Sequence, residues 1–513
     1  MKGMTLRKIV ELTQGDFCLS LPGEDGSCLV LDQDLVLCSG EKARSAYEAC
    51  LDTEISSIVT DSRKAGKGSL FGAIAGTRVD GHAFIPSVFV QGAVCALMER
   101  KPSEDELAGA KETGARAFLK VDRTIAALGR IAEGYLDLLG IPTVGITGSV
   151  GKTSTKEMIA AVLSVKLRTK KTEGNFNNDL GLPLTVFNLE PEDEVAVLEM
   201  GVSHFGDMTT LARIVRPGRM VITNLGTCHL EHLKDREGVF RAKTEVFDLM
   251  PEGAQVFLNG NDDLLLRVQE VGGVKPVFFG VDSHLEGVRD LSAGPVTGYP
   301  EGLEDDRCVT VASIRTLGFE GSECTLRTPA GELNVKVPVP GIHNCSNAAA
   351  AAAVGLSFGM TLDEIREGIE SARTISGRFR ILKAGSRTVI DDCYNANPVS
   401  MKSSLRVLSE AEGRRCAVLG DMGELGENEL ALHEAVGAYA ALCADHLVAI
   451  GPMSRSLYEA ALNAGKGLSA SWYESVDAFL AHADEEIGAD DTVLVKASHY
   501  MQFGRIVEAL TWS

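Results

Sequence analysis

The stretch "GSVGKT" contains Gly148, Gly151, Lys152 and Thr153 between the apolar run "TVGIT" and the helical pattern "STKEMIAAVLSV". Glycines let backbone N–H groups approach phosphate oxygens, and a helix N-terminus favours negative charge. Lys152 would then reach the β- and γ-phosphates, and Thr153 would place its hydroxyl on Mg²⁺. The common nucleotide loop has a further glycine where this chain has Ile146. The stretch predicts a phosphate-binding loop of unusual spacing; the alternative is a glycine turn without a ligand.

A phosphate loop does not define a reaction, and the Asn-Lys-x-Asp motif by which GTPases recognise guanine is absent from the sequence. Glu199 ends the apolar run "VAVLEMG", where a carboxylate could hold Mg²⁺, although a solvated charge is the commoner case. His229 follows the next such run, and spacing does not separate it from His232. Lys243 lies on a predicted helix in "FRAKTEVFDL", where a surface lysine is the plain interpretation.

Apolar runs that alternate with helical patterns must position these residues. The runs "TVGIT", "EVAVLEMG", "GRMVITNLG" and "AQVFLNG" predict a parallel sheet with helices on both faces. Residues 281–340 have shorter runs and more turns, which predict an antiparallel addition. A second alternation begins near Ile375 with "RTVIDDCY", "RCAVLGDMG", "HLVAIG" and "DTVLVKAS". The prediction is an α/β protein of three domains, divided near residues 140 and 375.

Composition limits the classes of partner. The chain has 513 residues, too many for one ordinary core, and 45% hydrophobic with 24% charged residues is a globular profile. Its formal net charge is −21, with no basic stripe, so a nucleic-acid-binding surface is not expected. An anionic substrate would need local cationic groups, because the net negative charge of the protein repels it.

The twelve cysteines are scattered and form no CxxC pair, which is typical of reduced thiols in a cytosolic protein. The first residues show no continuous signal core, and no apolar run is long enough for a membrane span. We therefore expect a cytoplasmic protein without a membrane span, and a monomer.

Taken together, the motifs resemble the Mur ligase family, the ATP-dependent amide-forming enzymes of peptidoglycan synthesis. The family loop is the shorter G-x-x-G-K-T/S, matched here from Gly148 to Thr153. The resemblance implies a UDP-sugar substrate-binding domain over residues 1–140 and a central ATP-binding ligase domain with a P-loop ATPase-like sheet over 141–374. A C-terminal Rossmann-like domain over 375–513 would receive the incoming substrate.

The resemblance also implies site residues, grouped by the ligand they would contact. The nucleotide-sugar end would use Asp61, Ser62, Arg63, Asp80, Gly81 and His82, and the substrate loop "TEGNFNNDLGLPLT" would use Asn175, Asn177 and Asn178. ATP would contact the loop with its Ser149 and Ser154, the "HNCSN" residues His343, Asn344 and Asn347, and Arg378 and Asp392. The incoming substrate would contact Tyr394, Asn395, Asn397, Lys496 and Ser498.

Within the family, "DDCYNANPVSM" and "LGDMGELGE" followed by His433 resemble the member that adds D-alanyl-D-alanine to UDP-N-acetylmuramoyl-tripeptide. The Asp-Asn-Pro-Arg of the diaminopimelate-adding relative is absent, and folylpolyglutamate synthase would not explain the first domain. One departure concerns the C-terminal motif, where His499 replaces an expected arginine and Gly504 an acidic residue.

The implied reaction is phosphorylation of a peptide carboxylate by ATP, followed by attack of an amine on the acyl phosphate. Lys152 and Arg378 would stabilise the transferring oxygens. One Mg²⁺ would lie on Thr153 and Glu199, and a second near Glu199 and His229. Lys243 matches the family lysine that CO₂ converts to a carbamate. The site would be completed when the C-terminal domain closes; the rival hypotheses are a sister ligase that adds one amino acid and an ATP-gated regulatory protein.

Overall fold

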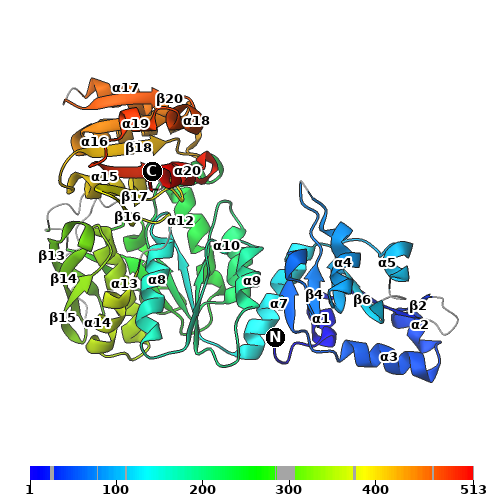
Figure 1. Cartoon of the computed structure of the whole chain (residues 1–513). Helices are drawn as coiled ribbons and strands as arrows, with labels where there is room; N and C mark the ends of the chain where they lie inside the picture. Colours follow the sequence, from blue (N-terminus) through cyan, green and yellow to red (C-terminus); the bar gives the residue numbers. More distant parts are fainter. Residues whose placement is uncertain are drawn as a thin grey trace. The chain divides into compact units, whose positions relative to one another are not determined.

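The computed structural model describes residues 1–22, 28–77, 79–109, 113–282, 285, 307–373, 377–464 and 467–511. Two compact units are present: Met1–Thr143 with Lys170–Met200 and Thr210–Arg216, and Val144–Thr169 with Gly201–Thr209 and Pro217–Ser513. Figure 1 shows the chain coloured from the N-terminus (blue) to the C-terminus (red). The predicted boundary at residue 375 lies outside the described residues, and both boundaries stay predictions.

The first unit contains a six-stranded sheet of order β2-β1-β6-β5-β4-β3. Strands β3 to β6 are parallel, whereas β1 runs antiparallel to both β2 and β6. The first fifty residues therefore add an antiparallel edge to this sheet, and the stretch "TLRKIVEL" contributes to helix α1. The elements are α1 (Leu6–Thr13), β1 (Asp16–Pro22), β2 (Cys28–Leu31), α2 (Gln33–Leu37), α3 (Glu41–Leu51), β3 (Ser57–Val59), η1 (Ser62–Lys64), β4 (Ser69–Gly72), η2 (Gly81–Phe84), α4 (Ile85–Val90), β5 (Cys95–Met98), α5 (Glu104–Ala108), β6 (Arg116–Lys120) and α7 (Thr124–Leu139).

The unit also includes most of a segment after the phosphate loop, with β8 (Thr169–Lys171), α9 (Gly181–Val186), β9 (Val195–Glu199) and α10 (Asp207–Val215). Every residue of β9 is buried, as expected for a strand covered on both faces.

Seven strands of the second unit lie in the order β15-β14-β13-β12-β11-β10-β7. The run from β7 to β13 is parallel, and β13, β14 and β15 are antiparallel, which confirms the predicted addition. The elements are β7 (Thr143–Thr147), α8 (Lys152–Ser164), β10 (Arg219–Ile222), α11 (Leu230–Leu233), α12 (Arg236–Thr244), η3 (Glu245–Leu249), β11 (Gln255–Asn259), η4 (Leu265–Arg267), β12 (Val277–Val281), β13 (Val309–Thr316), η6 (Gly318–Glu320), β14 (Ser322–Thr328), β15 (Gly331–Val337), α13 (His343–Ser357) and α14 (Leu362–Ser371).

The third sheet has the order β16-β17-β21-β18-β19-β20 and is parallel except for β16. Separate hydrophobic clusters cover its two faces, so it is a covered α/β sheet. The elements are β16 (Arg380–Ala384), β17 (Arg387–Asp391), α15 (Pro398–Ser409), β18 (Arg415–Gly420), η7 (Gly426–Asn428), α16 (Glu429–Cys443), β19 (His446–Ile450), α17 (Ser454–Asn463), β20 (Ser469–Tyr473), α18 (Val476–Leu480), α19 (Ala483–Glu486), β21 (Thr492–Lys496), η8 (His499–Met501) and α20 (Gly504–Thr511).

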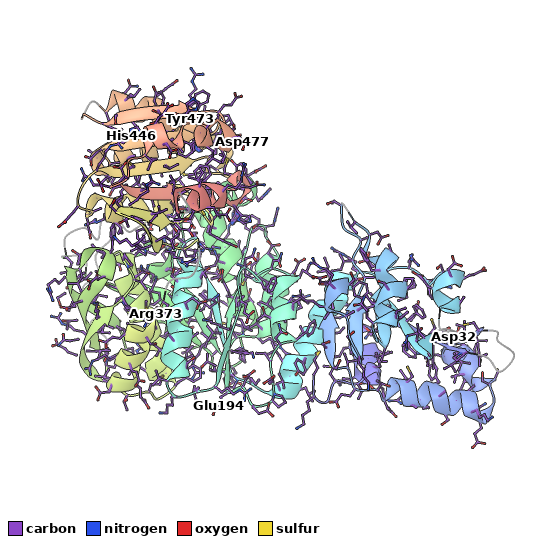
Figure 2. The ribbon with its side chains drawn as sticks, in the orientation of Figure 1. Asp32, Glu194, Arg373, His446, Tyr473 and Asp477 are labelled. Carbon is purple, nitrogen blue, oxygen red and sulfur yellow. The ribbon has the colours of Figure 1, made fainter. Side chains whose placement is uncertain are left out.

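A network of polar side chains lies at the β20 edge of this sheet. Glu486 accepts hydrogen bonds from His446 Nε2 at 2.7 Å and from the Tyr473 hydroxyl at 2.6 Å. Figure 2 labels His446 and Tyr473 among the side chains of this sheet. Burial and the Glu486 carboxylate raise the pKa of Tyr473 to about 12. Because each polar group has a partner, the network is a structural feature of the third sheet.

The three sheets confirm the predicted α/β fold class. Among the described residues, the structure contains no helix with the length and apolar character of a membrane span.

Candidate active site

The phosphate-binding loop connects β7 to α8, whose first residue is Lys152. Gly151 has φ 82° and Gly148 has φ 148°, a conformation that favours glycine. A Cβ on Gly148 would lie 1.9 Å from Thr223 Oγ1, so no other residue fits there without rearrangement. The predicted order of strand, glycine loop and helix is confirmed.

Residues after β10 hold this loop in shape. Asn224 Oδ1 accepts from Val150 N at 2.9 Å, and the Thr223 hydroxyl donates to Val150 O at 2.6 Å. Gly226 N donates to Ser149 Oγ at 2.8 Å. The loop therefore has a fixed geometry that depends on the neighbouring parallel strand.

The loop helix is tied to the predicted adenine-side motif at the start of α13. Thr155 Oγ1 donates to Asn347 Oδ1 at 2.9 Å, and Asn347 Nδ2 donates to Asn344 Oδ1 at 2.9 Å. Within the loop, Lys152 Nζ donates to the carbonyl of Gly148 at 2.8 Å. The structure thus joins two motifs that are nearly two hundred residues apart in the sequence.

His343 begins α13 beside a small cavity lined by residues that include Lys402 and Arg406. Burial lowers the pKa of His343 to about 4; the charge of Asp392 raises it by a smaller amount, and the charge of Lys496 lowers it slightly further. The imidazole is therefore neutral at pH 7 and near the polar cluster of the third sheet.

Lys243 is fully buried, so its interpretation as a surface lysine is wrong. Its Nζ has no hydrogen-bond partner among the described residues. Burial lowers the pKa of Lys243 to about 8; Cys228 acts in the other direction, and the positive charge of Lys152 adds a smaller lowering. A buried amine without a partner is expensive, which indicates that something else satisfies it in the working protein.

Glu199 ends β9 and is 1% exposed, so its interpretation as a solvated charge is also wrong. The Glu199 carboxylate accepts from Asn177 Nδ2 at 2.8 Å. Asn178 Oδ1 accepts from Gly181 N at 2.7 Å and shapes the same loop, and Asn175 lies exposed before them. The predicted substrate loop and the predicted metal-binding carboxylate are therefore neighbours within the first unit.

The two histidines that spacing did not separate have different surroundings. His229 precedes α11 with φ 53°, and its Nδ1 lies 2.5 Å from Glu424 Oε2. His232 instead stacks on His204, with ring centroids 4.0 Å apart. Only His229 therefore contacts a residue of the third sheet through an ion pair among the described contacts.

The predicted nucleotide-sugar residues occupy two short turns of the first unit, and Ser62 begins η1. Arg63 contacts both carboxylate oxygens of Asp61 at 2.9 and 2.7 Å, which lowers the pKa of Asp61 to about 2. Asp80 Oδ1 accepts from His82 N at 2.9 Å and lies 2.6 Å from His82 Nδ1. Both turns end in cationic or hydrogen-bonding side chains, as a phosphate or sugar requires.

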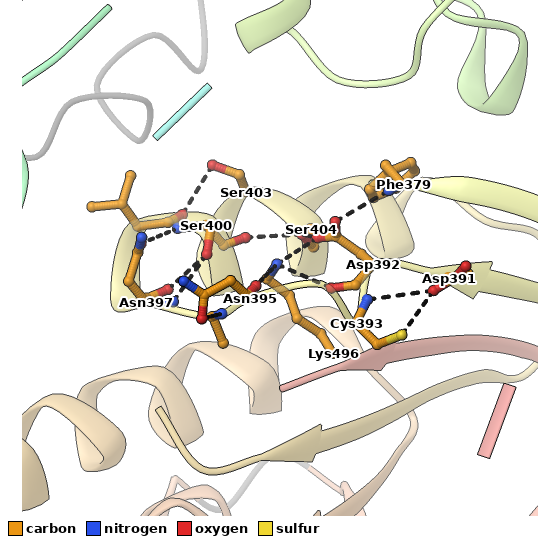
Figure 3. Close-up of polar contacts among 12 residues, drawn as sticks. Phe379, Asp391, Asp392, Cys393, Asn395, Asn397, Ser400, Ser403, Ser404 and Lys496 are labelled. Carbon is orange, nitrogen blue, oxygen red and sulfur yellow. Dashed lines mark hydrogen bonds and ion pairs between the residues drawn. The ribbon is translucent and has the colours of Figure 1, made fainter. Parts of the chain in front are cut away.

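A polar cluster lies at the carboxyl ends of β17 and β21 (Figure 3). Asp392 Oδ2 accepts from Lys496 Nζ at 2.6 Å and from Ser404 Oγ at 2.6 Å. Lys496 Nζ also donates to the carbonyl of Asn395 at 3.0 Å. The Asp392–Lys496 ion pair thus forms a buried framework, and direct ligand contact by these residues stays a prediction.

Arg378 is held by the same segment. Its guanidinium lies 3.9 Å from the ring centroid of Tyr394, and the Tyr394 ring lies 5.6 Å from that of His499. Asn397 caps α15, accepting from Ser400 N at 2.9 Å. Gly504 stands where an acidic residue was expected, and a Cβ on it would meet open space, so the position lies at a surface. The replacement of the acidic residue by glycine therefore does not distort the cluster.

Profiles of three Mur ligase domains match the chain. They are the Mur ligase family, catalytic domain over residues 54–136, the Mur ligase middle domain over 146–355, and the Mur ligase, glutamate ligase domain over 377–499. A Bacillus subtilis (strain 168) protein named UDP-N-acetylmuramoyl-tripeptide--D-alanyl-D-alanine ligase is 33% identical over 478 residues, which is 92% of this chain and 96% of the relative. The chain belongs to the Mur ligase family.

Solved structures agree with this membership. MurF from Acinetobacter baumannii has a TM-score of 0.79 at 29% identity, with 99% of each chain covered. MurF ligase from Thermotoga maritima, solved in complex with ADP, has a TM-score of 0.73 at 26% identity and covers 90% of this chain and 97% of its own.

Sequence reasoning about this Mur ligase missed Thr223, Asn224 and Glu424. Thr223 and Asn224 directly follow the apolar run that forms β10, which lies parallel to β7, the strand before the loop. Residues at the ends of adjacent parallel strands are neighbours, so this position could have indicated their contact with the loop. Glu424 lies within the quoted motif "LGDMGELGE", yet its partner His229 is visible only in the fold.

Proposed function

We propose that this Mur ligase joins D-alanyl-D-alanine to UDP-N-acetylmuramoyl-tripeptide with conversion of ATP to ADP and phosphate, a step of peptidoglycan precursor synthesis. The observation that carries the proposal is similarity along nearly the whole chain to relatives with that printed name. The phosphate loop, the adenine-side motif and the two nucleotide-sugar turns all lie within the matched residues.

A carboxylate resists attack by an amine because its oxygen is a poor leaving group. Transfer of the γ-phosphoryl group of ATP forms an acyl phosphate and ADP. The amine nitrogen of D-alanyl-D-alanine then attacks the acyl carbon, an amide bond forms, inorganic phosphate leaves with the bonding electron pair, and the nitrogen loses a proton. The protein contributes position and charge rather than a covalent intermediate.

The loop N–H groups and Lys152 would hold the β- and γ-phosphates at the start of α8. Arg378 would add a second cation from the third sheet, with its guanidinium plane held against Tyr394. His343, Asn344 and Asn347 would contact the base. Lys152 already lies within the loop, where its Nζ donates to the Gly148 carbonyl at 2.8 Å.

The donor set fits Mg²⁺ and a modified lysine. Thr153, Glu199 and His229 supply a hydroxyl, a carboxylate and an imidazole, and would hold the metal; bound Mg²⁺ neutralises phosphate charge. The partnerless Lys243 Nζ fits a carbamate, since a pKa of about 8 leaves a fraction of neutral amine to react with CO₂. A carbamate would replace a buried cation by an anion that can accept hydrogen bonds or support a metal.

The substrate ends would be divided between the units. The turns at Asp61–Arg63 and Asp80–His82 would bind the UDP end, and Asn177 the peptide near Glu199. The incoming dipeptide would meet the edge formed by Tyr394, Asn395 and Ser498. We also propose the cytoplasm as compartment, because all twelve cysteines are free thiols.

The test is an ADP-release assay with UDP-N-acetylmuramoyl-tripeptide and either D-alanyl-D-alanine or single amino acids as acceptor. We expect release that requires the dipeptide, and its loss in Lys152→Ala. Preference for a single amino acid would favour the sister ligase, and release that needs no acceptor would favour the ATP-gated protein.

A further inference from the structure

Glu424 brings a carboxylate of the third sheet to His229. It lies in the segment between β18 and η7, and its Oε2 is 2.5 Å from His229 Nδ1. His229 Nδ1 has no aligned hydrogen-bond partner among the described residues, so the contact is a close approach of the carboxylate to the ring nitrogen rather than an aligned hydrogen bond.

Both partners have a backbone conformation that is unusual for their residue types. His229 has φ 53° and Glu424 has φ 61°, in the left-handed region. Such conformations are disfavoured for residues with a side chain and persist where the surrounding structure over-determines them. Glycine would adopt either conformation without strain, so two side chains retained at these positions and touching each other indicate that the contact has a use.

The segment around Glu424 is anchored to helix α16 and to the residues that follow β21. Met422 N donates to His433 Nε2 at 2.9 Å, and Gly423 N donates to Ser498 Oγ at 2.9 Å. A Cβ on Gly426 would lie 3.5 Å from Glu231 N, so the far side of the segment lies directly on α11. The third sheet therefore presents Glu424 to His229 from a fixed support.

We propose that Glu424 is a positioning residue for the ligase reaction that acts through His229. The proposal rests on the function proposed above, in which His229 supports Mg²⁺. A carboxylate beside a metal-binding histidine orients the ring and raises its basicity, and the Nδ1 contact leaves Nε2 for a ligand. Glu424 lies in the segment that follows β18 of the third sheet, so the His229 ring is held only when that sheet is in place. The contact would thereby link the residues predicted to meet the dipeptide to the predicted phosphate-binding loop.

A purely structural role predicts something different. The Glu424 side chain is 56% exposed, and an exposed ion pair contributes little to stability. Loss of Glu424 should therefore leave folding almost unchanged while it affects whatever His229 binds.

The test measures Mn²⁺ binding to the ADP-bound full chain by electron paramagnetic resonance. The variants are Glu424→Gln, His229→Ala and the double variant, with Glu427→Gln as control because Glu427 is an exposed carboxylate three residues further on. Glutamine is compatible with the backbone, since Gln14 and Gln502 adopt the same left-handed region. We expect Glu424→Gln to weaken Mn²⁺ binding about tenfold, Glu427→Gln to leave it unchanged, and Glu424→Gln to have no further effect when His229 is already alanine.

Four results would each overturn the proposal. Two concern the single variants: unchanged Mn²⁺ binding in Glu424→Gln, or equal losses of binding in Glu424→Gln and Glu427→Gln. The others are independent losses in the double variant and no Mn²⁺ binding by the unaltered chain. Failure of the proposed function is a separate result. It would appear as a lack of ADP release in response to the dipeptide, while the Mn²⁺ measurements would still report the coupling between Glu424 and His229. In steady-state kinetics, Glu424→Gln should lower kcat more than it raises the KM for the dipeptide.

Discussion

The surroundings of Lys243 differ from those that its residue type and its place on a helix suggest. The sequence places it on a helix, where lysine is usually solvated, yet the fold removes it from water and gives it no partner among the described residues. Desolvation disfavours the charged form, and this is the main cause of its lowered pKa. Sequence reasoning recovered Lys243 only through the family resemblance, because burial is not encoded in its local pattern.

Replacement of Lys243 by methionine should stabilise the fold and abolish ligation. The folded-state pKa lies below the unfolded one, so the unfolded chain binds more protons between about pH 8 and 10.5, and stability rises with pH through that window. In CO₂-free buffer at pH 7, Lys243→Met should be more stable by up to about 3 kcal/mol, an advantage that fades towards pH 10.5. Urea unfolding at several pH values measures this difference.

Bicarbonate provides the control for the carbamate. It should raise the Tm of the unaltered chain and not that of Lys243→Met. A variant less stable than the unaltered chain at pH 7, or an equal bicarbonate effect on both, would contradict the proposed chemistry of Lys243.

The buried strands show which elements were predictable. The apolar runs predicted β7, β9, β10 and β11, and β17, β18, β19 and β21 of the third sheet, because buried strands carry continuous apolar residues. The strand order was not predictable, since the position of β21 between β17 and β18 depends on pairing between distant segments. The same limit applied to Thr223 and Asn224, whose role depends on β10 lying beside β7.

Close packing of α14 on α8 gives a prediction about these elements. A Cβ on Gly368 would lie 2.3 Å from Val162 Cα, so the helices must separate to accept one. Gly368→Ala should destabilise the chain by about 1 to 3 kcal/mol, measured by urea unfolding. Glu367→Ala, an exposed change on the same helix, should stay within about 0.5 kcal/mol; similar values for the two variants would show that this packing is not tight.

The whole molecule combines motifs that are distant in sequence. The phosphate loop, the "HNCSN" helix start and the polar ends of β17 and β21 belong to one compact unit, while the nucleotide-sugar turns and Glu199 belong to the other. The class of fold and the motifs were predictable because each lies in a continuous stretch. The His229–Glu424 pair was not, because it joins two sheets whose approach no local pattern specifies. The predicted closure of the C-terminal domain and the monomeric state stay predictions.

The chemistry that unites these motifs is phosphorylation of a substrate carboxylate. The decisive measurement uses UDP-N-acetylmuramoyl-tripeptide labelled with ¹⁸O in the reacting carboxylate, together with ATP and D-alanyl-D-alanine, and analyses the released phosphate by mass spectrometry. An acyl phosphate predicts one ¹⁸O atom transferred to each phosphate in step with dipeptide ligation. Unlabelled phosphate would mean that water, and not the substrate carboxylate, receives the phosphoryl group, and it would contradict the assignment of this chain as an ATP-driven peptide ligase.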